Sequence, residues 1–532
     1  MKKNSSEKKK QSAIGMFFKS VGEYIKKKYP FLIILFTGFV AITALNFYKI
    51  STTDSVAAFA VDDFEIGQIS DRTIIAEKSL PSDEFNPVSV QKGENIVKKG
   101  FPVTEEGYAK LQKIATSPVY VDYRAFANSE IYLFMIAVLW YLLLSFLPFG
   151  RKIKISEVIL QVVFVLIIYA CASLGGKLPV FSSDYTICII LPLSLCILLL
   201  SILYGQLPSV IFAFISSLVI LNATNWALPT FLFSLGSALF SAAIVRKISR
   251  RIDMIFASIM ISIMNIVFVM LLAVIFNENF DNLKFTFFGV ALNGFLSGLL
   301  ALALLTPLEL LLNTASVFRL MDLSDLNNAF MQNMLVQASG TYQHSMMVAQ
   351  LAENACREIG AKFLVARVGA YYHDIGKIEQ SEYFVENQKG ENIHDTLSPS
   401  LSVSVIRSHV KRGVEKAHQL HLPQAVIDII AEHHGNSVIS YFYNEAKDKD
   451  PTVSPEDFAY PGLPPTSIES AVVMLSDTVE AACRTLENKS VPSLEKFIDK
   501  LVQSKIDHKQ LDNCNLTFSD LTKIKRSFVQ IL

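Results

Sequence analysis

The sequence has little charge. Asp, Glu, Lys and Arg make up 18% of its 532 residues, whereas soluble domains usually carry about 25%. The deficit lies mostly between residues 30 and 312, so the chain divides into an apolar part and a C-terminal part of ordinary composition. The formal net charge is zero. Global charge therefore indicates no partner, and we expect no nucleic-acid polymer to bind.

Cysteine pairs and early histidines are also lacking. The six cysteines show no CxxC or other paired spacing, which argues against a disulfide framework and a zinc knuckle. All nine histidines lie at or after His344. Metal or acid–base chemistry is therefore expected in the C-terminal part of the chain.

The apolar part predicts a membrane protein. The run PFLIILFTGFVAITALNF is long enough to cross a bilayer, and nine lysines precede it. Because no small-residue cleavage site follows, we expect a basic N-terminus at 1–29 and an uncleaved anchor at 30–48. Seven further apolar runs within residues 130–312 predict a seven-span domain. They lie at roughly 130–149, 156–175, 185–204, 208–222, 228–245, 254–276 and 285–312.

Basic residues in the loops predict the orientation of these spans. One cluster follows the first of the seven runs and another follows the fifth. They comprise Arg151, Lys152 and Lys154, and then Arg246, Lys247, Arg250 and Arg251. The positive-inside rule places both clusters and the C-terminal region in the cytoplasm, and residues 49–129 outside. Ionisable residues are scarce within the spans, which favours a receptor or an anchor over a transporter.

Residues 49–129 predict a small α+β module. The stretch RTIIAEKSL alternates like a strand. VTEEGYAKL predicts a helix with Thr104 as its N-cap and acidic residues in its first turn. Such a short segment can bury only a limited core, and it contains no catalytic constellation. A spacer and a sensory module both stay open.

Residues 320–532 predict an all-α domain. SMMVAQLAENACREIG, for example, has apolar residues at helical spacing and ends at Gly360. Alternation typical of strands is nearly absent. The fold class we expect is therefore mainly α, a polytopic helical membrane domain followed by an all-α domain, with the small α+β segment between the anchor and the seven spans.

Six candidate metal ligands lie along these C-terminal helices. Imidazole and carboxylate together suit iron, manganese or zinc. Neighbouring residues on a helix diverge by about 100°, which suits a terminal histidine beside a bridging aspartate. Six ligands exceed what one catalytic site with open positions needs, so two metals are expected. The candidates are His344, His373, Asp374, His409, His433 and Asp477.

This ordered set resembles the HD phosphohydrolase superfamily. The match is closer to the seven-transmembrane HD-domain proteins, which hydrolyse cyclic di-AMP. The resemblance covers nearly the whole chain, from anchor to C-terminal domain. The motifs that carry it are ASGTYQHSMMVAQLAE, YYHDIGKI, YFVENQKGENIHDTLSPSLS, HVKRGVEKA, IIAEHHGNSVISYFY and YPGLPPTSIESAVVMLSDTVEAACRTL.

The resemblance implies a site and an activity. His344, His373, Asp374 and Asp477 would hold one cation, and Asp374 would bridge to a second cation held by His409 and His433. The metals implied are Mn²⁺ or Fe²⁺, with Asp374 and His373 as catalytic residues. Substrate contacts are expected at Lys377, His434 and Arg484. The product would be linear pApA, formed at a bacterial cell membrane, with regulation through the membrane or the external region.

The sequence also departs from the family and leaves alternatives open. Gln343 stands where the family usually has the first of two histidines, and Ser339 where proline is usual. The external region is shorter than many in the family. Rival functions are cyclic di-GMP hydrolysis, hydrolysis of mononucleotides or alarmones, and nucleotide binding without catalysis. A cyclic di-GMP enzyme of the HD-GYP type would carry Gly-Tyr-Pro soon after the paired histidines, where HHGNSVISYFY stands here. A homodimer and an unidentified ligand of the membrane or external region also stay open.

Overall fold

The structure is a computed structural model. It describes residues 29–50, 61–76, 79–82, 87–115, 123–147, 153–246, 248, 250–388, 390–487 and 490–532. The basic N-terminal segment before Tyr29 and the loop residues Arg151, Lys152 and Lys247 lie outside these ranges. The chain forms two compact units, Met1–Ala303 and Leu304–Leu532.

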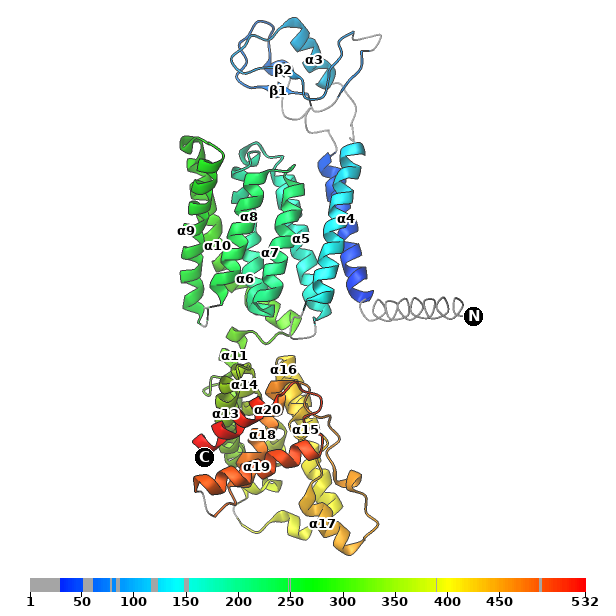
Figure 1. Ribbon diagram of the computed structural model, residues 1–532, viewed down its shortest axis with the longest axis vertical. Helices are drawn as coiled ribbons and strands as arrows, with labels where there is room; N and C mark the ends of the chain where they lie inside the picture. The colour runs from blue at the N-terminus through cyan, green and yellow to red at the C-terminus, as the bar shows by residue number, and fades with distance from the viewer. Residues whose placement is uncertain are drawn as a thin grey trace, which may run out of the picture. The chain divides into compact units, whose positions relative to one another are not determined.

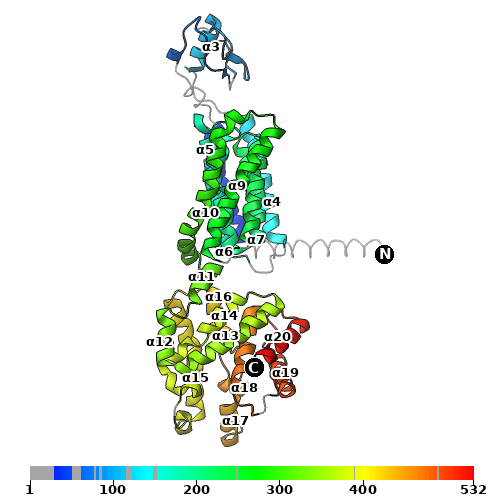
Figure 2. The same cartoon turned by 90° about the vertical axis from the view of Figure 1, so that its left-hand side faces the viewer.

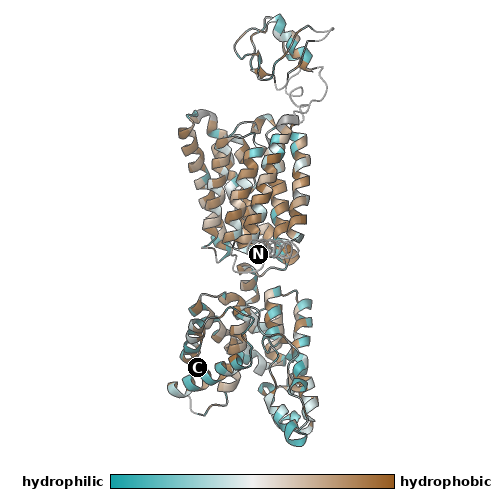
Figure 3. Ribbon diagram, turned by 45° about the vertical axis from the view of Figure 1, so that its right-hand side comes forward, coloured by the Kyte–Doolittle hydropathy of each residue, from teal (hydrophilic) through white to brown (hydrophobic). Residues whose placement is uncertain are grey.

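The first unit contains the membrane bundle. Among the described residues, eight helical segments are long and apolar enough to cross a membrane, the last of which continues into the second unit. They run side by side, and apolar residues dominate them (Figures 1, 2 and 3). The chain is therefore a multi-pass membrane protein. The segments are Tyr29–Ile50, α4 (Tyr123–Phe146), α5 (Ile155–Gly175), Thr186–Tyr204 with α6 (Leu193–Tyr204) as its main part, α7 (Gln206–Ala223), α8 (Leu228–Val245), α9 (Arg251–Ile275) and α10 (Lys284–Leu312).

The apolar run expected at 185–204 is not one continuous helix. A short 3₁₀ helix, η3 (Thr186–Ile189), comes first, and α6 begins only at Leu193. Pro192 precedes α6 as its N-cap. Because proline has no backbone N–H to donate, it favours the start of a helix over its interior.

The helix Tyr29–Ile50 is packed into the bundle by polar contacts. Glu130 of α4 accepts hydrogen bonds from the hydroxyl of Thr43 at 2.7 Å and from the amide of Asn46 at 2.8 Å. The hydroxyl of Tyr169 on α5 donates to the side-chain oxygens of Asn46 and Asn222, at 3.0 and 3.1 Å. Such bonds stabilise helix association where water is absent. The anchor is thus part of the helical bundle.

The small module of the first unit is α+β, as predicted, in its described residues. Strands β1 (Ile74–Ile75) and β2 (Asn95–Val97) pair antiparallel beside helix α3 (Glu105–Ala115). The hydroxyl of Thr104 accepts from the amide of Gly107 at 3.0 Å, so the expected N-cap is present.

The second unit is all α-helical apart from 3₁₀ turns and one isolated bridge in its described residues, which confirms the prediction for this part of the chain. α13 ends at Gly360, whose φ of +73° is the left-handed conformation of a C-cap. The helices are α11 (Val317–Leu323), α12 (Ala329–Gln337), α13 (Ser339–Ile359), α14 (Phe363–Tyr372), α15 (Pro399–Gln419), α16 (Gln424–Glu432), α17 (Ser440–Lys449), α18 (Ile468–Cys483), α19 (Val491–Asp507) and α20 (Phe518–Ile531).

A buried arginine joins the end of α10 to the helical core of this unit. The guanidinium of Arg319 donates to the backbone oxygens of Glu309 and Thr314, at 3.0 and 3.1 Å. It also donates to the backbone oxygen of His421, in the turn between α15 and α16. Only 9% of Arg319 is exposed. This side chain therefore connects the last apolar helix to the two helices that bring His409 and His433 into the unit.

Candidate metal centre

The structure brings the six predicted ligands into one buried cluster. His344 lies on α13, His409 on α15 and Asp477 on α18. His373 and Asp374 follow the end of α14, and His433 follows the end of α16. All six are buried, with no more than 7% of any residue exposed.

Asp374 is at the centre of this cluster, with its two oxygens facing different histidines. Its Oδ2 lies 3.2 Å from Nε2 of His373 and 3.6 Å from Nε2 of His344. Its Oδ1 lies 3.4 Å from Nε2 of His409 and 3.7 Å from Nε2 of His433. One carboxylate thus faces two groups of imidazole nitrogens, which is the arrangement that a bridging ligand requires.

The local backbone differs from our expectation at the His373–Asp374 pair. α14 ends at Tyr372, and Asp374 has φ −105° and ψ 18°, outside the helical region. The helix on which we expected the pair to lie therefore does not extend through Asp374. Nε2 of His373 and both oxygens of Asp374 nevertheless lie in the same cluster.

Gly376 explains how the following 3₁₀ helix, η5 (Ile375–Tyr383), can lie against α15. A Cβ at this position would fall well inside van der Waals contact of the backbone oxygen of His409 and the backbone nitrogen of Gly413. Glycine is therefore the residue that allows this close approach. The approach sets the separation between Asp374 and His409.

Hydrogen bonds at Nδ1 fix the orientation of four rings. Nδ1 of His373, His409 and His433 lies 2.8, 2.5 and 2.8 Å from the backbone oxygen three residues earlier. Nδ1 of His344 lies 2.5 Å from Oε2 of Glu480. A proton on Nδ1 leaves the Nε2 lone pair of each ring directed into the cluster, as metal-binding histidines require.

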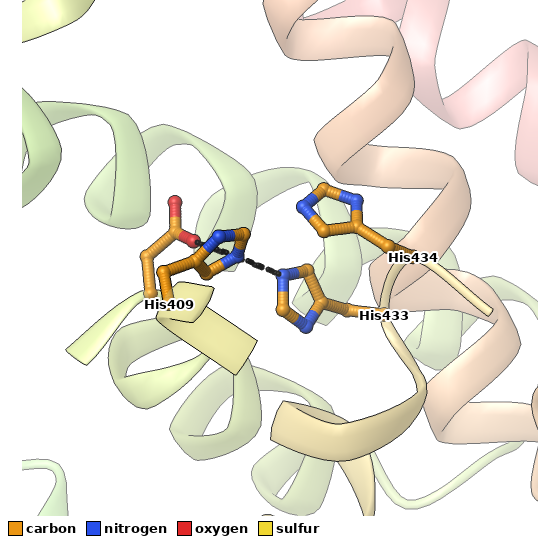
Figure 4. A group of neighbouring side chains, drawn as sticks. His409, His433 and His434 are labelled. Atoms are coloured by element: carbon orange, nitrogen blue, oxygen red, sulfur yellow. Dashed lines mark hydrogen bonds and ion pairs between the residues drawn. The ribbon is translucent and has the colours of Figure 1, made fainter. Parts of the chain in front are cut away.

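His434 joins the cluster as well. One ring nitrogen lies within 4.8 Å of ligand atoms from Asp374, His409 and His433, and Nδ1 is 3.6 Å from Oδ2 of Asp477. Figure 4 shows the rings of His409, His433 and His434 close together. The His434 ring also stacks on Tyr460, with ring centroids 4.2 Å apart. Tyr460 was not among the residues predicted for the site.

Lys377 lies against the shared carboxylate. Its Nζ is 2.7 Å from Oδ2 of Asp374 and 3.0 Å from Oε1 of Glu386, and 12% of its side chain is exposed. Burial alone would lower the pKa of Lys377, but the two carboxylates raise it above its usual value. Lys377 is therefore a charged group inside the site, and Glu386 is a partner that the sequence motifs did not predict.

Arg484 does not lie in the cluster. Its Nε and Nη2 bind Oε1 of Glu480 at 2.7 and 2.6 Å, and 42% of its side chain is exposed. Glu480 in turn holds the ring of His344. Glu480 was not predicted for the site, although it lies one turn after Asp477 and so shares a face of α18.

The electrostatics of the cluster favour bound cations. Burial lowers the pKa of His344, but hydrogen bonds to Asp477 and Glu480 raise it to about 10, because these carboxylates attract positive charge. Burial lowers the pKa of His409 to about 4 and that of His433 to about 3, so both rings are neutral and can donate lone pairs. Metal ions and protons compete for such sites.

Two buried atoms also fit a cation. Nε2 of His373 and Oδ1 of Asp374 have no hydrogen-bond partner among the described residues. Buried polar atoms usually have partners, and a bound metal would supply one to each. The donor set of imidazole nitrogens and carboxylate oxygens suits a divalent transition metal.

Two models of known families match parts of this chain. Residues 341–482 match the HD domain family, and residues 126–316 match the family described as "7TM receptor with intracellular HD hydrolase". The chain therefore carries both parts of the predicted seven-transmembrane HD-domain architecture, and the predicted resemblance is confirmed.

Two curated relatives in this family carry the name cyclic-di-AMP phosphodiesterase PgpH. The Bacillus subtilis protein is 30% identical over 471 residues, which cover 86% of this chain and 65% of the relative. The Listeria monocytogenes protein is 28% identical over 505 residues, which cover 93% of this chain and 69% of the relative. The chain thus spans about two thirds of the length of these relatives.

One solved structure is the HD domain of L. monocytogenes PgpH in complex with cyclic di-AMP. It is 39% identical to this chain over the matched part, which is 39% of this chain and 97% of the solved domain, with a TM-score of 0.38.

Proposed function

We propose that this chain is a membrane-anchored, metal-dependent phosphodiesterase that hydrolyses cyclic di-AMP to linear pApA. The observation that carries the proposal is the central carboxylate of Asp374, whose two oxygens face two groups of histidine nitrogens. The choice of substrate rests on the two curated relatives, both named as cyclic-di-AMP phosphodiesterases.

The ligands divide into two half-sites around Asp374. The first half-site consists of His344, His373, Asp477 and Oδ2 of Asp374. The second consists of His409, His433 and Oδ1 of Asp374, with His434 as a further ligand or a substrate contact. Their donor atoms suit two divalent cations, Mn²⁺ or Fe²⁺. Such a pair of cations, when bound, lowers the pKa of water and offsets the charge of a phosphodiester.

The surrounding residues have distinct roles in this proposal. Asp374 contributes one oxygen to each half-site and so fixes the distance between them. His373 directs its Nε2 toward Oδ2 of Asp374. Lys377 carries a positive charge next to the same oxygen, where it stabilises negative charge on a phosphate. His434 and Tyr460 form a stacked aromatic surface at the second half-site. Arg484 acts indirectly, because its guanidinium is bound to Glu480.

We place the protein in a bacterial cell membrane with the catalytic domain in the cytoplasm. Basic residues such as Lys154, Arg246 and Arg250 support this orientation by the positive-inside rule. A cyclic dinucleotide made inside the cell would then reach the site directly. Signals that act through the membrane bundle or the external module would regulate it.

The test uses the full chain in lipid nanodiscs, loaded with Mn²⁺ or Fe²⁺. Cyclic di-AMP, cyclic di-GMP and mononucleotides are supplied separately, and products are separated by chromatography. We expect cyclic di-AMP to be hydrolysed fastest and pApA to accumulate. A preference for cyclic di-GMP or mononucleotides would overturn the substrate, and binding without hydrolysis of any of them would overturn the activity.

A further inference from the structure

The four fixed rings do not share the same kind of Nδ1 partner. The rings of His373, His409 and His433 lie against backbone oxygens, which are neutral acceptors. His344 instead lies against a carboxylate, Oε2 of Glu480, at 2.5 Å. A carboxylate accepts more strongly than a carbonyl and makes the opposite ring nitrogen a more basic ligand. His344 is therefore the ligand with the strongest support from its surroundings.

Glu480 is itself held in place. It lies on α18 one turn after Asp477, and only 6% of the residue is exposed. Arg484, a further turn along, binds Oε1 of Glu480 at 2.6 Å, and so leaves Oε2 for His344. α18 thus carries both Asp477 and Glu480, the partner of His344, one helical turn apart.

The charges of the two half-sites are also unequal. The first half-site has a carboxylate of its own, Asp477, whose Oδ1 is 3.0 Å from Nε2 of His344, and Glu480 lies behind it. Among the described residues, the second half-site shares Asp374 and meets a second carboxylate only through His434, whose Nδ1 is 3.6 Å from Oδ2 of Asp477. Lys377 lies 2.7 Å from Oδ2 of Asp374, the oxygen of the first half-site, and so opposes a cation there, but Glu386 offsets part of its charge and Asp477 and Glu480 add two carboxylates on the same side.

We propose that Glu480 is a positioning residue that makes the first half-site the tighter of the two. Its carboxylate holds Nδ1 of His344, fixes the ring and strengthens Nε2 as a ligand. The second half-site, whose histidines have carbonyl partners, releases its cation more readily. This inference rests on the metal centre of the proposed function, but not on the identity of the substrate.

The test measures metal binding by the full chain in nanodiscs. Apoprotein is titrated with Mn²⁺, free Mn²⁺ is followed by its electron paramagnetic resonance signal, and activity is not needed. We expect two classes of site, with one tight cation per chain. Glu480→Gln should weaken the tight class about 10- to 100-fold, the usual range for loss of such a partner, and leave the weak class unchanged.

Two further variants assign the classes to the half-sites. Asp477→Asn should remove the tight class, whereas His409→Ala should remove the weak class and keep one tight cation. Glu353→Gln is the matched control. Glu353 is also a partly buried carboxylate that binds arginines, at 2.7 Å from Arg357 and 3.1 Å from Arg367, but it touches no ligand.

Arg484→Gln provides a graded test of the same chain of contacts. Since Glu480 would keep its carboxylate but lose its arginine, we expect a smaller loss of affinity at the tight class than in Glu480→Gln. If the variants only damaged the fold, the apoproteins would melt at lower temperatures, and the loss of metal affinity would follow the loss of stability. Melting curves of the apoproteins detect this case.

Some outcomes would overturn the inference. These are two indistinguishable classes of site in the unmodified chain, a Glu480→Gln variant that weakens both classes equally, or one that weakens neither. The proposed function fails separately, if metal binding follows this pattern but no nucleotide is hydrolysed.

Discussion

Replacing Gly376 with alanine tests how closely η5 must approach α15. The added Cβ would fall well inside van der Waals contact of the backbone of His409 and Gly413. Both of these obstacles are backbone atoms and not flexible side chains, so η5 and α15 must move apart. The shift is roughly 1–1.5 Å if an ordinary contact near 3.4 Å is restored. The distance of 3.4 Å between Oδ1 of Asp374 and Nε2 of His409 would increase with them.

The energetic cost follows from this overlap. Overpacking of a buried contact costs about 1–3 kcal/mol. For a unit of this size, that cost lowers the melting temperature by about 2–12 °C. We also expect weaker metal binding at the second half-site, because its ligands come from both of the separated segments.

The assay combines thermal unfolding with a count of bound Mn²⁺. Gly390→Ala is the matched control, since a Cβ there meets nothing within 4 Å and its φ is not in the left-handed range. If Gly376→Ala melted like the unmodified protein and bound both cations, the close approach of η5 to α15 would not determine the geometry of the site.

Three more predictions follow from other contacts. Arg319→Met should destabilise the C-terminal unit by about 1–3 kcal/mol for each buried acceptor left unpaired, because the backbone oxygens of Glu309 and His421 lose their donor. Thermal unfolding measures this, with the half-exposed Arg357→Met as control. Lys377→Gln should lower kcat for cyclic di-AMP by about 100- to 1,000-fold while the number of bound cations stays the same, since losing such a contact at the transition state costs about 2.7–4 kcal/mol; an unchanged kcat would refute the role. Tyr460→Leu should raise KM about tenfold with little change in kcat, in line with about 1–3 kcal/mol for stacking on a base. A fall in kcat as large as the rise in KM would contradict a binding role for the surface that Tyr460 shares with His434.

The sequence was sufficient to predict the fold class and to select the ligands that meet in space. Apolar runs, loop charge and helical spacing are local signals, so the membrane bundle and the all-α unit could be read from them. The six candidate ligands could be selected because imidazole and carboxylate recur in a recognisable order, and the structure places them in one cluster. That they hold two cations around Asp374 stays a prediction.

Other features depend on tertiary contacts that no local pattern encodes. α14 ends at Tyr372, so the continuous helix that the spacing assumed does not include Asp374, and the close approach of η5 to α15 at Gly376 has no local signature. Arg484 carries the same charge whether it meets a phosphate or a glutamate, and only the fold places it on Glu480. Tyr460 lies far from His434 along the chain, and its stacking on that ring has no signature in sequence.

The most direct test of the central claim is the number of cations bound by Asp374→Ala. The full chain in nanodiscs is loaded with Mn²⁺, dialysed and analysed by elemental mass spectrometry, together with hydrolysis of cyclic di-AMP. Because one carboxylate faces both half-sites, we predict two cations in the unmodified protein, loss of both in the variant, and almost no activity. A variant that keeps two cations and near-normal turnover would contradict a bridging role for Asp374.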